Sequence, residues 1–125
     1  MGEIPKELKL LAEWKKILGL HDWVIVLRTD CNKEEMQIDY ADGEVAYEEV
    51  SKSAEVRILK EELTKGEIRK FDFEQVLVHE LLHLKFALLT KGEDWENDLQ
   101  LRITHVLIDD LARAFVEVKR KGEKK

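Results

Sequence analysis

The stretch from Asp72 to Gly92 constrains the fold most, because its side chains are apolar nearly all the way round a helix. Asp72 is a good N-cap residue, and Gln75 three positions later completes a capping box. Gly92 is a typical residue at which a helix ends. A helix that is apolar on nearly every side is buried in a protein core. We therefore predict a buried helix from Phe73 to about Thr90.

The residues that follow predict a second helix, from about Asp94 to about Lys119, which forms a hairpin with the first. It carries an apolar stripe of the kind that packs against a core. The residues of this stripe are Leu99, Ile103, Leu107, Leu111, Ala114 and Val118. The last residues, 119–125, form a basic tail that we expect to fray.

The first half of the chain predicts one helix and three strands. The helix begins at Pro5 and ends at Gly19, and Trp23–Arg28 is a short segment rich in β-branched residues. Met36–Leu59 reads as two more strands, with a hairpin turn at Ser51–Ser53. The predicted class is α+β, a single domain over residues 1–125. A small antiparallel three-stranded sheet would pack on the N-terminal helix and the C-terminal helical hairpin.

Composition excludes several classes of protein. The chain has 125 residues, of which 44% are hydrophobic and 38% charged, and a net charge of −6. This charge argues against a nucleic-acid partner that would need a basic surface. No apolar run is long enough to span a membrane, and one cysteine, Cys31, rules out an internal disulfide framework. We expect a cytoplasmic protein. Abundant Glu and Lys with few Asn and Gln suggest a thermophilic source.

The first of the two C-terminal helices carries the most informative motif, His79-Glu-Leu-Leu-His83. Residues four positions apart lie on one face of a helix, so both imidazoles can reach one point. Zinc accepts histidine nitrogens at about 2.0–2.1 Å, so two ligands one turn apart fit it. Glu80 can take a proton from a water that the metal activates. The alternative is that the motif occurs by chance. However, burying two histidines and a glutamate without a partner costs free energy, and a bound metal offsets this cost.

A catalytic zinc site has three protein ligands and an open position, so a third ligand must come from elsewhere. His105 and His79, each about 11 residues from the expected turn, lie at about the same depth in two antiparallel helices. His105 is therefore the predicted third ligand, and the alternative is a hydrogen-bonded core histidine. Asp109 is a candidate to orient His105, or a solvated charge. The other candidate ligands are Glu93, Asp94, Glu96, Asp98 and Asp109.

An HExxH motif on a helix after a small antiparallel sheet resembles the zincin metallopeptidases. The resemblance covers residues 21 to 118, as a minimal single-domain form like short phage-derived and microbial zincin-like proteins. It implies that the motif helix is the active-site helix. It also implies that a strand at the edge of the sheet holds a peptide substrate extended across the metal.

The chain departs from the known branches of this superfamily. Phe86 and Leu89 stand where a metzincin would have a glycine and a third histidine. Gluzincins use a glutamate on the following helix, where this chain has His105. SprT-like proteases also use three histidines, but their third usually lies in a glycine-containing loop. Many zincins carry a residue that stabilises the oxyanion, and the candidates here are Tyr40, Tyr47, His21 and Arg102.

Three functions remain open on the sequence. The first is a zinc-dependent metallopeptidase with a peptide or protein substrate, one Zn²⁺ per chain held by His79, His83 and His105, and Glu80 as general base. The second is a non-catalytic zinc-binding or interaction protein, for example with a phage-assembly or chaperone-like role. The third is a metal-dependent hydrolase with a substrate other than a peptide.

Overall fold

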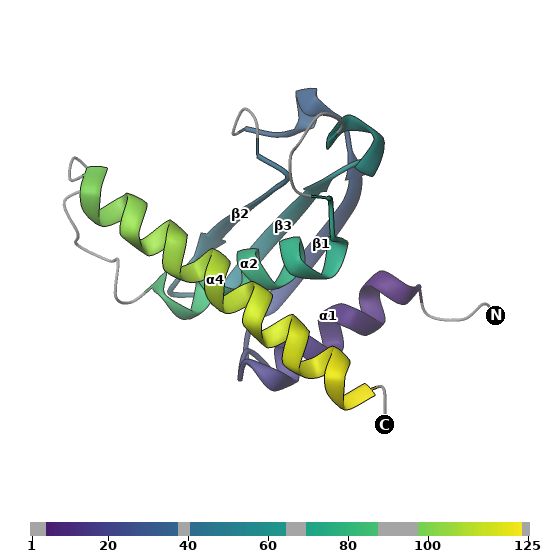
Figure 1. Ribbon diagram of the computed structural model, residues 1–125. Helices are drawn as coiled ribbons and strands as arrows, with labels where there is room; N and C mark the ends of the chain where they lie inside the picture. Colours follow the sequence, from purple (N-terminus) through teal and green to yellow (C-terminus); the bar gives the residue numbers. More distant parts are fainter. Residues whose placement is uncertain (1–4, 38–40, 65–69, 88–97, 124–125) are drawn as a thin grey trace.

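The computed structural model describes residues 5–37, 41–64, 70–87 and 98–123. Within these ranges three helices gather on one side of a three-stranded sheet, and α2 (Phe73–Lys85) lies between the sheet and the outer helix α4 (Asp98–Glu123; Figure 1). The α+β class is confirmed. The elements are α1 (Lys6–Ile17), β1 (Val24–Cys31), β2 (Gly43–Glu48), β3 (Ser53–Leu59), α2 (Phe73–Lys85) and α4 (Asp98–Glu123), with 3₁₀ turns at Lys33–Glu35 and Glu61–Thr64.

The sheet has the strand order β1-β3-β2. The predicted antiparallel pairing holds for the hairpin of β2 and β3, in which Val45 lies opposite Val56. It is wrong for β1, which runs parallel to β3. β3 takes the central position because it is the most buried strand, with Val56–Leu59 all buried. β3 therefore lies between β1 and β2, its partner in the hairpin. As a result, β2 is an edge strand of the sheet.

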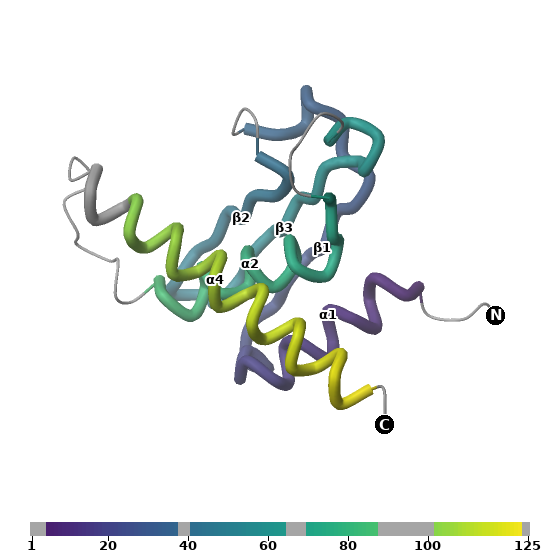
Figure 2. Tube along the Cα trace, in the orientation of Figure 1, coloured from purple at the N-terminus to yellow at the C-terminus, as the bar shows by residue number. Residues whose placement is uncertain are grey.

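The core lies between the sheet and α2. Gly19, with a φ of +69°, ends α1 as predicted, and this helix buries Leu11 and Trp14 against the rest of the core. Figure 2 shows that α2 lies next to the sheet, whereas α1 and α4 lie further from it. α2 itself buries apolar residues on several sides, as predicted, although it ends at Lys85 rather than near Thr90. These residues are Leu77, Val78, Leu81, Leu82 and Leu84.

The predicted apolar stripe of the last helix does not face the core. Ile103, Leu107 and Val118 are 51%, 53% and 69% exposed. The residues that α4 buries are Ile108, Ala112 and Val116, each 1% exposed. At 100° per residue these two stripes lie on opposite sides of the helix. Because α4 has two apolar faces, periodicity alone could not decide which of them packs on α2.

Residues 119–123 of the predicted basic tail belong to the last helix. α4 continues to Glu123. The Lys119 side chain is only 12% exposed and lies 2.9 Å from a carboxylate oxygen of Glu74. Arg120 forms an ion pair with Asp72 at 2.8 Å. Cations of the tail thus meet acidic residues at the start of α2, and this pairing fixes the end of α4 on the fold.

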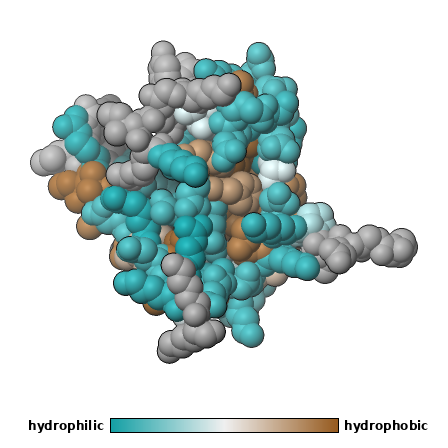
Figure 3. All heavy atoms as spheres, turned by 45° about the vertical axis from the view of Figure 1, so that its right-hand side comes forward, coloured by the Kyte–Doolittle hydropathy of each residue, from teal (hydrophilic) through white to brown (hydrophobic). Residues whose placement is uncertain are grey.

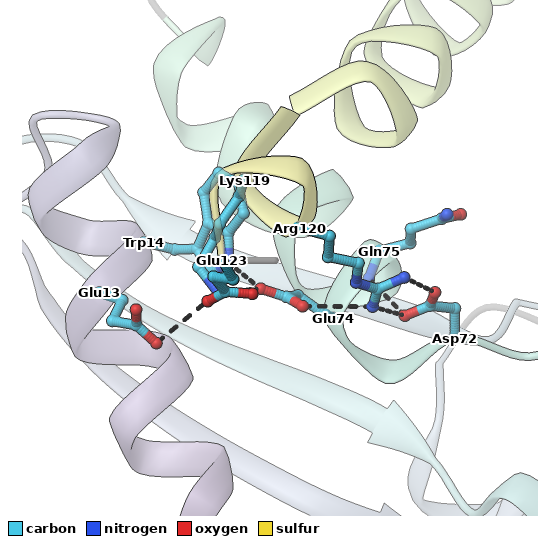
Figure 4. Close-up of polar contacts among 8 residues, drawn as sticks. All are labelled: Glu13, Trp14, Asp72, Glu74, Gln75, Lys119, Arg120 and Glu123. Carbon is cyan, nitrogen blue, oxygen red and sulfur yellow. Dashed lines mark hydrogen bonds and ion pairs between the residues drawn. The ribbon is translucent and has the colours of Figure 1, made fainter. Parts of the chain in front are cut away.

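Glu74 is the centre of this polar cluster (Figure 4). Its carboxylate accepts hydrogen bonds from Trp14 Nε1 at 2.7 Å, Lys119 Nζ at 2.9 Å and Arg120 Nη2 at 3.2 Å. Burial raises the pKa of Glu74, but the bonds from Lys119 and Trp14 outweigh burial and hold the pKa below its usual value. One carboxylate therefore joins α1, α2 and α4.

Replacing Glu74 by Gln should lower the free energy of unfolding by about 2–4 kcal/mol at pH 7, since two cations lose a buried partner. The lowered pKa of Glu74 stabilises the folded wild-type protein at pH values above 4.5, which is the pKa of this glutamate in the unfolded chain. That stability is lost as the pH falls through the lower folded pKa. The difference between the two proteins in urea unfolding should therefore shrink towards pH 3. Glu13→Gln, at a half-exposed site 3.8 Å from Lys119, should have little effect at any pH.

Candidate metal centre

Helix α2 positions both motif histidines and the glutamate between them. It begins at its predicted N-cap, where the Asp72 side chain accepts a hydrogen bond from the backbone N–H of Gln75. Its packing against the sheet, α1 and α4 leaves one face open to solvent at the motif. His79 and His83 are half-buried on that face, and Glu80 is buried. The helix can therefore offer two imidazoles and one carboxylate to the same space.

The structure brings the three predicted ligands together. The ring centroids of His79 and His83 are 5.1 Å apart, and His105 on α4 lies 6.0 Å and 5.0 Å from them. One nitrogen from each ring lies within 4.8 Å of the others. The neighbours of His105 on the inner side of α4, Ile108 and Ala112, are buried, while His105 itself is exposed. The equal depth inferred from the helix lengths is therefore present in the fold.

The electrostatic setting favours the neutral form of His79 and His83. Burial, and then the neighbouring His79 and His105, lower the pKa of His83 to about 4. Burial also lowers the pKa of His79, although Asp109 opposes this shift. A neutral imidazole has a free lone pair, and this is the form that ligates a metal. His79 and His83 are therefore neutral, ligating groups at neutral pH.

Glu80 is only 6% exposed. Its burial, and then the negative charge of Glu44, raise the pKa of Glu80 to about 8. Glu44 lies on β2, where Arg57 of β3 donates a hydrogen bond to it at 2.7 Å. In the metal-free protein Glu80 is therefore mostly protonated at neutral pH, and a zinc ion bound beside it would favour the carboxylate form, which can accept a proton.

Gly43 allows β2 to lie close to the motif helix. A Cβ atom at Gly43 would lie 2.6 Å from Val76 Cγ1 and 3.4 Å from Glu80 Oε2. A contact below 3 Å forces a displacement, so a larger residue would have to move the Val76 side chain or separate β2 from α2. The absent side chain therefore keeps the edge strand against the carboxylate.

The histidines and Glu80 line a cleft of about 490 Å³. One wall is the edge strand β2 with Gly43, Val45 and Tyr47, and the floor is α2. His105 and Asp109 contribute the opposite wall from α4.

Asp109 contacts a different histidine from the one suggested by the sequence. Its Oδ1 lies 3.5 Å from Nδ1 of His79, and its Oδ2 lies 3.4 Å from Arg113. A carboxylate at Nδ1 fixes the ring and leaves Nε2 for a metal. The expected partner was His105, four residues earlier on the same helix. Asp109 instead extends across to α2, because the two helices pack with these faces together.

The remaining sequence candidates have mixed outcomes. Of the four oxyanion candidates, Tyr47 lines the cleft, whereas His21 and Arg102 are exposed outside it and Tyr40 lies outside the described residues. The rival ligands Glu93, Asp94 and Glu96 also lie outside the described part, and Asp98 is known only as the first residue of α4. Cys31 is buried at the end of β1 rather than in a polar loop.

Comparisons with protein-family models, with curated proteins and with solved structures give no significant match. Among the described helices, none has both the length and the apolar character that a membrane span requires.

Proposed function

We propose that this protein is a zinc-dependent metallopeptidase of the zincin type. The observation that carries the proposal is the meeting of His79, His83 and His105 beside the buried Glu80, in a cleft walled by an edge strand. We also propose that it acts in the cytoplasm, which a single cysteine, free and buried, supports.

The three imidazoles fit one zinc ion per chain. Ligand atoms of a tetrahedral zinc lie about 3.4 Å apart, so small side-chain rotations would bring nitrogens that now lie within 4.8 Å onto one ion. Three nitrogen ligands leave a fourth position open, as catalytic sites require. Bound there, zinc would act as a Lewis acid that polarises a carbonyl and lowers the pKa of water.

Glu80 would move the proton in the reaction. It lies next to His79 and lines the same cleft, so its carboxylate can accept a proton from the attacking water. It can then donate this proton to the leaving amine. Its burial excludes bulk water, which would otherwise exchange the proton. Asp109 would hold the ring of His79 in the ligating orientation.

The edge strand β2 supports a peptide as substrate. The backbone N–H of Leu59 donates to the carbonyl of Asp42, so the hydrogen-bonded pairs with β3 fall on alternate residues from there. The N–H and C=O groups of Gly43, Val45 and Tyr47 therefore point away from β3. An extended peptide can pair with these groups, which would hold its backbone along the cleft.

The purified protein should contain about one zinc per chain and cleave members of a peptide library. A strong chelator should abolish cleavage and zinc should restore it. X-ray absorption should show nitrogen and oxygen ligands without sulfur, because Cys31 is buried away from the cleft. Zinc binding without cleavage of any peptide would favour the non-catalytic zinc-binding or interaction protein. Cleavage of esters alone would favour the third hypothesis.

A further inference from the structure

Arg113 of α4 lies between the candidate metal centre and a second cavity of the fold. Asp109, one helical turn earlier, lines the cleft together with the three imidazoles. Arg113 lines a neighbouring cavity of about 900 Å³, together with residues of α1 and of the start of α2. Its side chain is 37% exposed. Arg113 therefore adjoins the metal centre from outside the cleft.

The two oxygens of the Asp109 carboxylate have different partners. Oδ1 lies 3.5 Å from Nδ1 of His79, and Oδ2 lies 3.4 Å from Nη2 of Arg113. The spacing of four residues brings Asp109 and Arg113 together on one face of α4. One carboxylate therefore connects the guanidinium group of Arg113 to a ring that we propose as a zinc ligand.

Arg113 also pairs with Asp110, whose Oδ1 accepts a hydrogen bond from Nη2 of the arginine at 2.5 Å. Two neighbouring carboxylates repel each other, and a cation that binds both offsets this repulsion. Without the cation, Asp109, whose side chain is 40% exposed, would turn towards solvent and away from Asp110. The guanidinium group therefore limits the directions in which the Asp109 carboxylate can point.

Stability alone does not account for an arginine at this position. Hydrophilic residues cover most of the face shown in Figure 3, and exposed ion pairs on such a surface contribute little free energy. In addition, Nε of Arg113 is buried and has no hydrogen-bond partner in the part of the chain that the structure describes. A buried donor without a partner costs free energy. Such a cost is expected where a residue serves a functional site.

We propose that Arg113 is a positioning residue, which holds the Asp109 carboxylate against Nδ1 of His79 and so presents Nε2 of this ring to the cleft. A carboxylate at Nδ1 keeps the proton on that nitrogen, so the lone pair of Nε2 stays free for a metal. This role rests on the proposed function, since the orientation of the ring matters only if His79 binds zinc.

The tautomer of His79 tests this role without zinc. In the zinc-free protein at about pH 8, ¹⁵N NMR of the imidazoles should show the Nδ1–H tautomer of His79. Arg113→Gln should raise the share of the Nε2–H tautomer, because Asp109 is then held less well, and Asp109→Asn should do the same. Arg102→Gln makes the same chemical change at an exposed site on α4 and should leave the tautomer unchanged. A His79 tautomer that does not respond to Arg113→Gln would overturn the proposal.

Zinc affinity provides a second test, because positioning and simple electrostatics predict opposite signs. Arg113 is a cation, so its removal would by charge alone strengthen the binding of Zn²⁺. If Arg113 positions Asp109, Arg113→Gln should instead weaken zinc binding about tenfold, the lower end of what the outer partners of a metal site contribute. Arg113→Lys keeps the charge but not the fork, and it should retain only part of the affinity. Binding that is unchanged or tighter in Arg113→Gln, measured by competition with a zinc indicator, would contradict the positioning role.

A double-mutant cycle shows whether Arg113 acts through Asp109. In the Asp109→Asn background, Arg113→Gln should cause little further loss of zinc affinity, since the carboxylate that it holds is gone. Losses that add in the double variant would show an independent effect and refute the proposal. Circular dichroism should show the same helix content in all variants. A wild-type protein that binds no zinc would refute the metal centre, whereas the tautomer of His79 would still decide whether Arg113 positions Asp109.

Discussion

Replacing Glu80 by Gln should abolish peptide hydrolysis while leaving zinc binding intact. The amide has nearly the same shape as the carboxylate, but it cannot take a proton from water or return one to the leaving amine. General acid–base catalysis contributes about 10²- to 10⁴-fold, and Glu80 would serve in both steps. We therefore expect kcat to fall by at least about 10³-fold with a nearly unchanged KM.

Two measurements make this result specific. Zinc content and affinity should match the wild type, because Glu80 lies beside the imidazoles without being one of the proposed ligands. Glu117→Gln makes the same chemical change at an exposed site on α4 and should retain full activity. If the Glu80 variant kept wild-type activity with zinc bound, the proposed role of Glu80 would be wrong. Loss of zinc together with activity would assign it to the ligand set instead.

Local sequence signals were sufficient for the motif helix. The N-cap Asp72 and the continuous apolar run determine where α2 begins and that it is buried. Once the helix is known, the four-residue spacing of His79 and His83 puts them on one face. The matched depth of His79 and His105 held although both helix ends differ from the prediction, because α2 ends about five residues earlier and α4 begins about four residues later than expected.

Contacts between distant segments were not predictable in the same way. The parallel pairing of β1 with β3 depends on which strand is most buried in the assembled sheet, and no local pattern in Val24–Cys31 reports this. The contact of Asp109 with His79 depends on how α4 is rotated about its axis. That rotation was ambiguous because α4 is apolar on two faces. Gly43 became informative only when Val76 and Glu80 were found against it.

The second large effect is expected at His105, which we propose as the third zinc ligand. His105→Ala should weaken zinc binding by about two to four orders of magnitude, because a three-ligand site loses one of its protein donors. Competition with a zinc indicator measures this change directly. Circular dichroism should be unaffected, since His105 is exposed on α4 and contributes little to the core.

Graded controls separate ligation from indirect effects. Asp109→Asn keeps all three imidazoles but weakens the contact at His79 Nδ1, so zinc affinity should fall only about 10- to 100-fold. His21→Ala removes an exposed histidine outside the cleft and should leave affinity unchanged. Replacing Glu96 or Asp98 by Ala should also change the zinc affinity little. If the change at Glu96 or Asp98 weakened binding more than His105→Ala, the ligand set would be two histidines and a carboxylate. That ranking would move the chain to the gluzincin branch, because the donor on the second helix distinguishes the two arrangements.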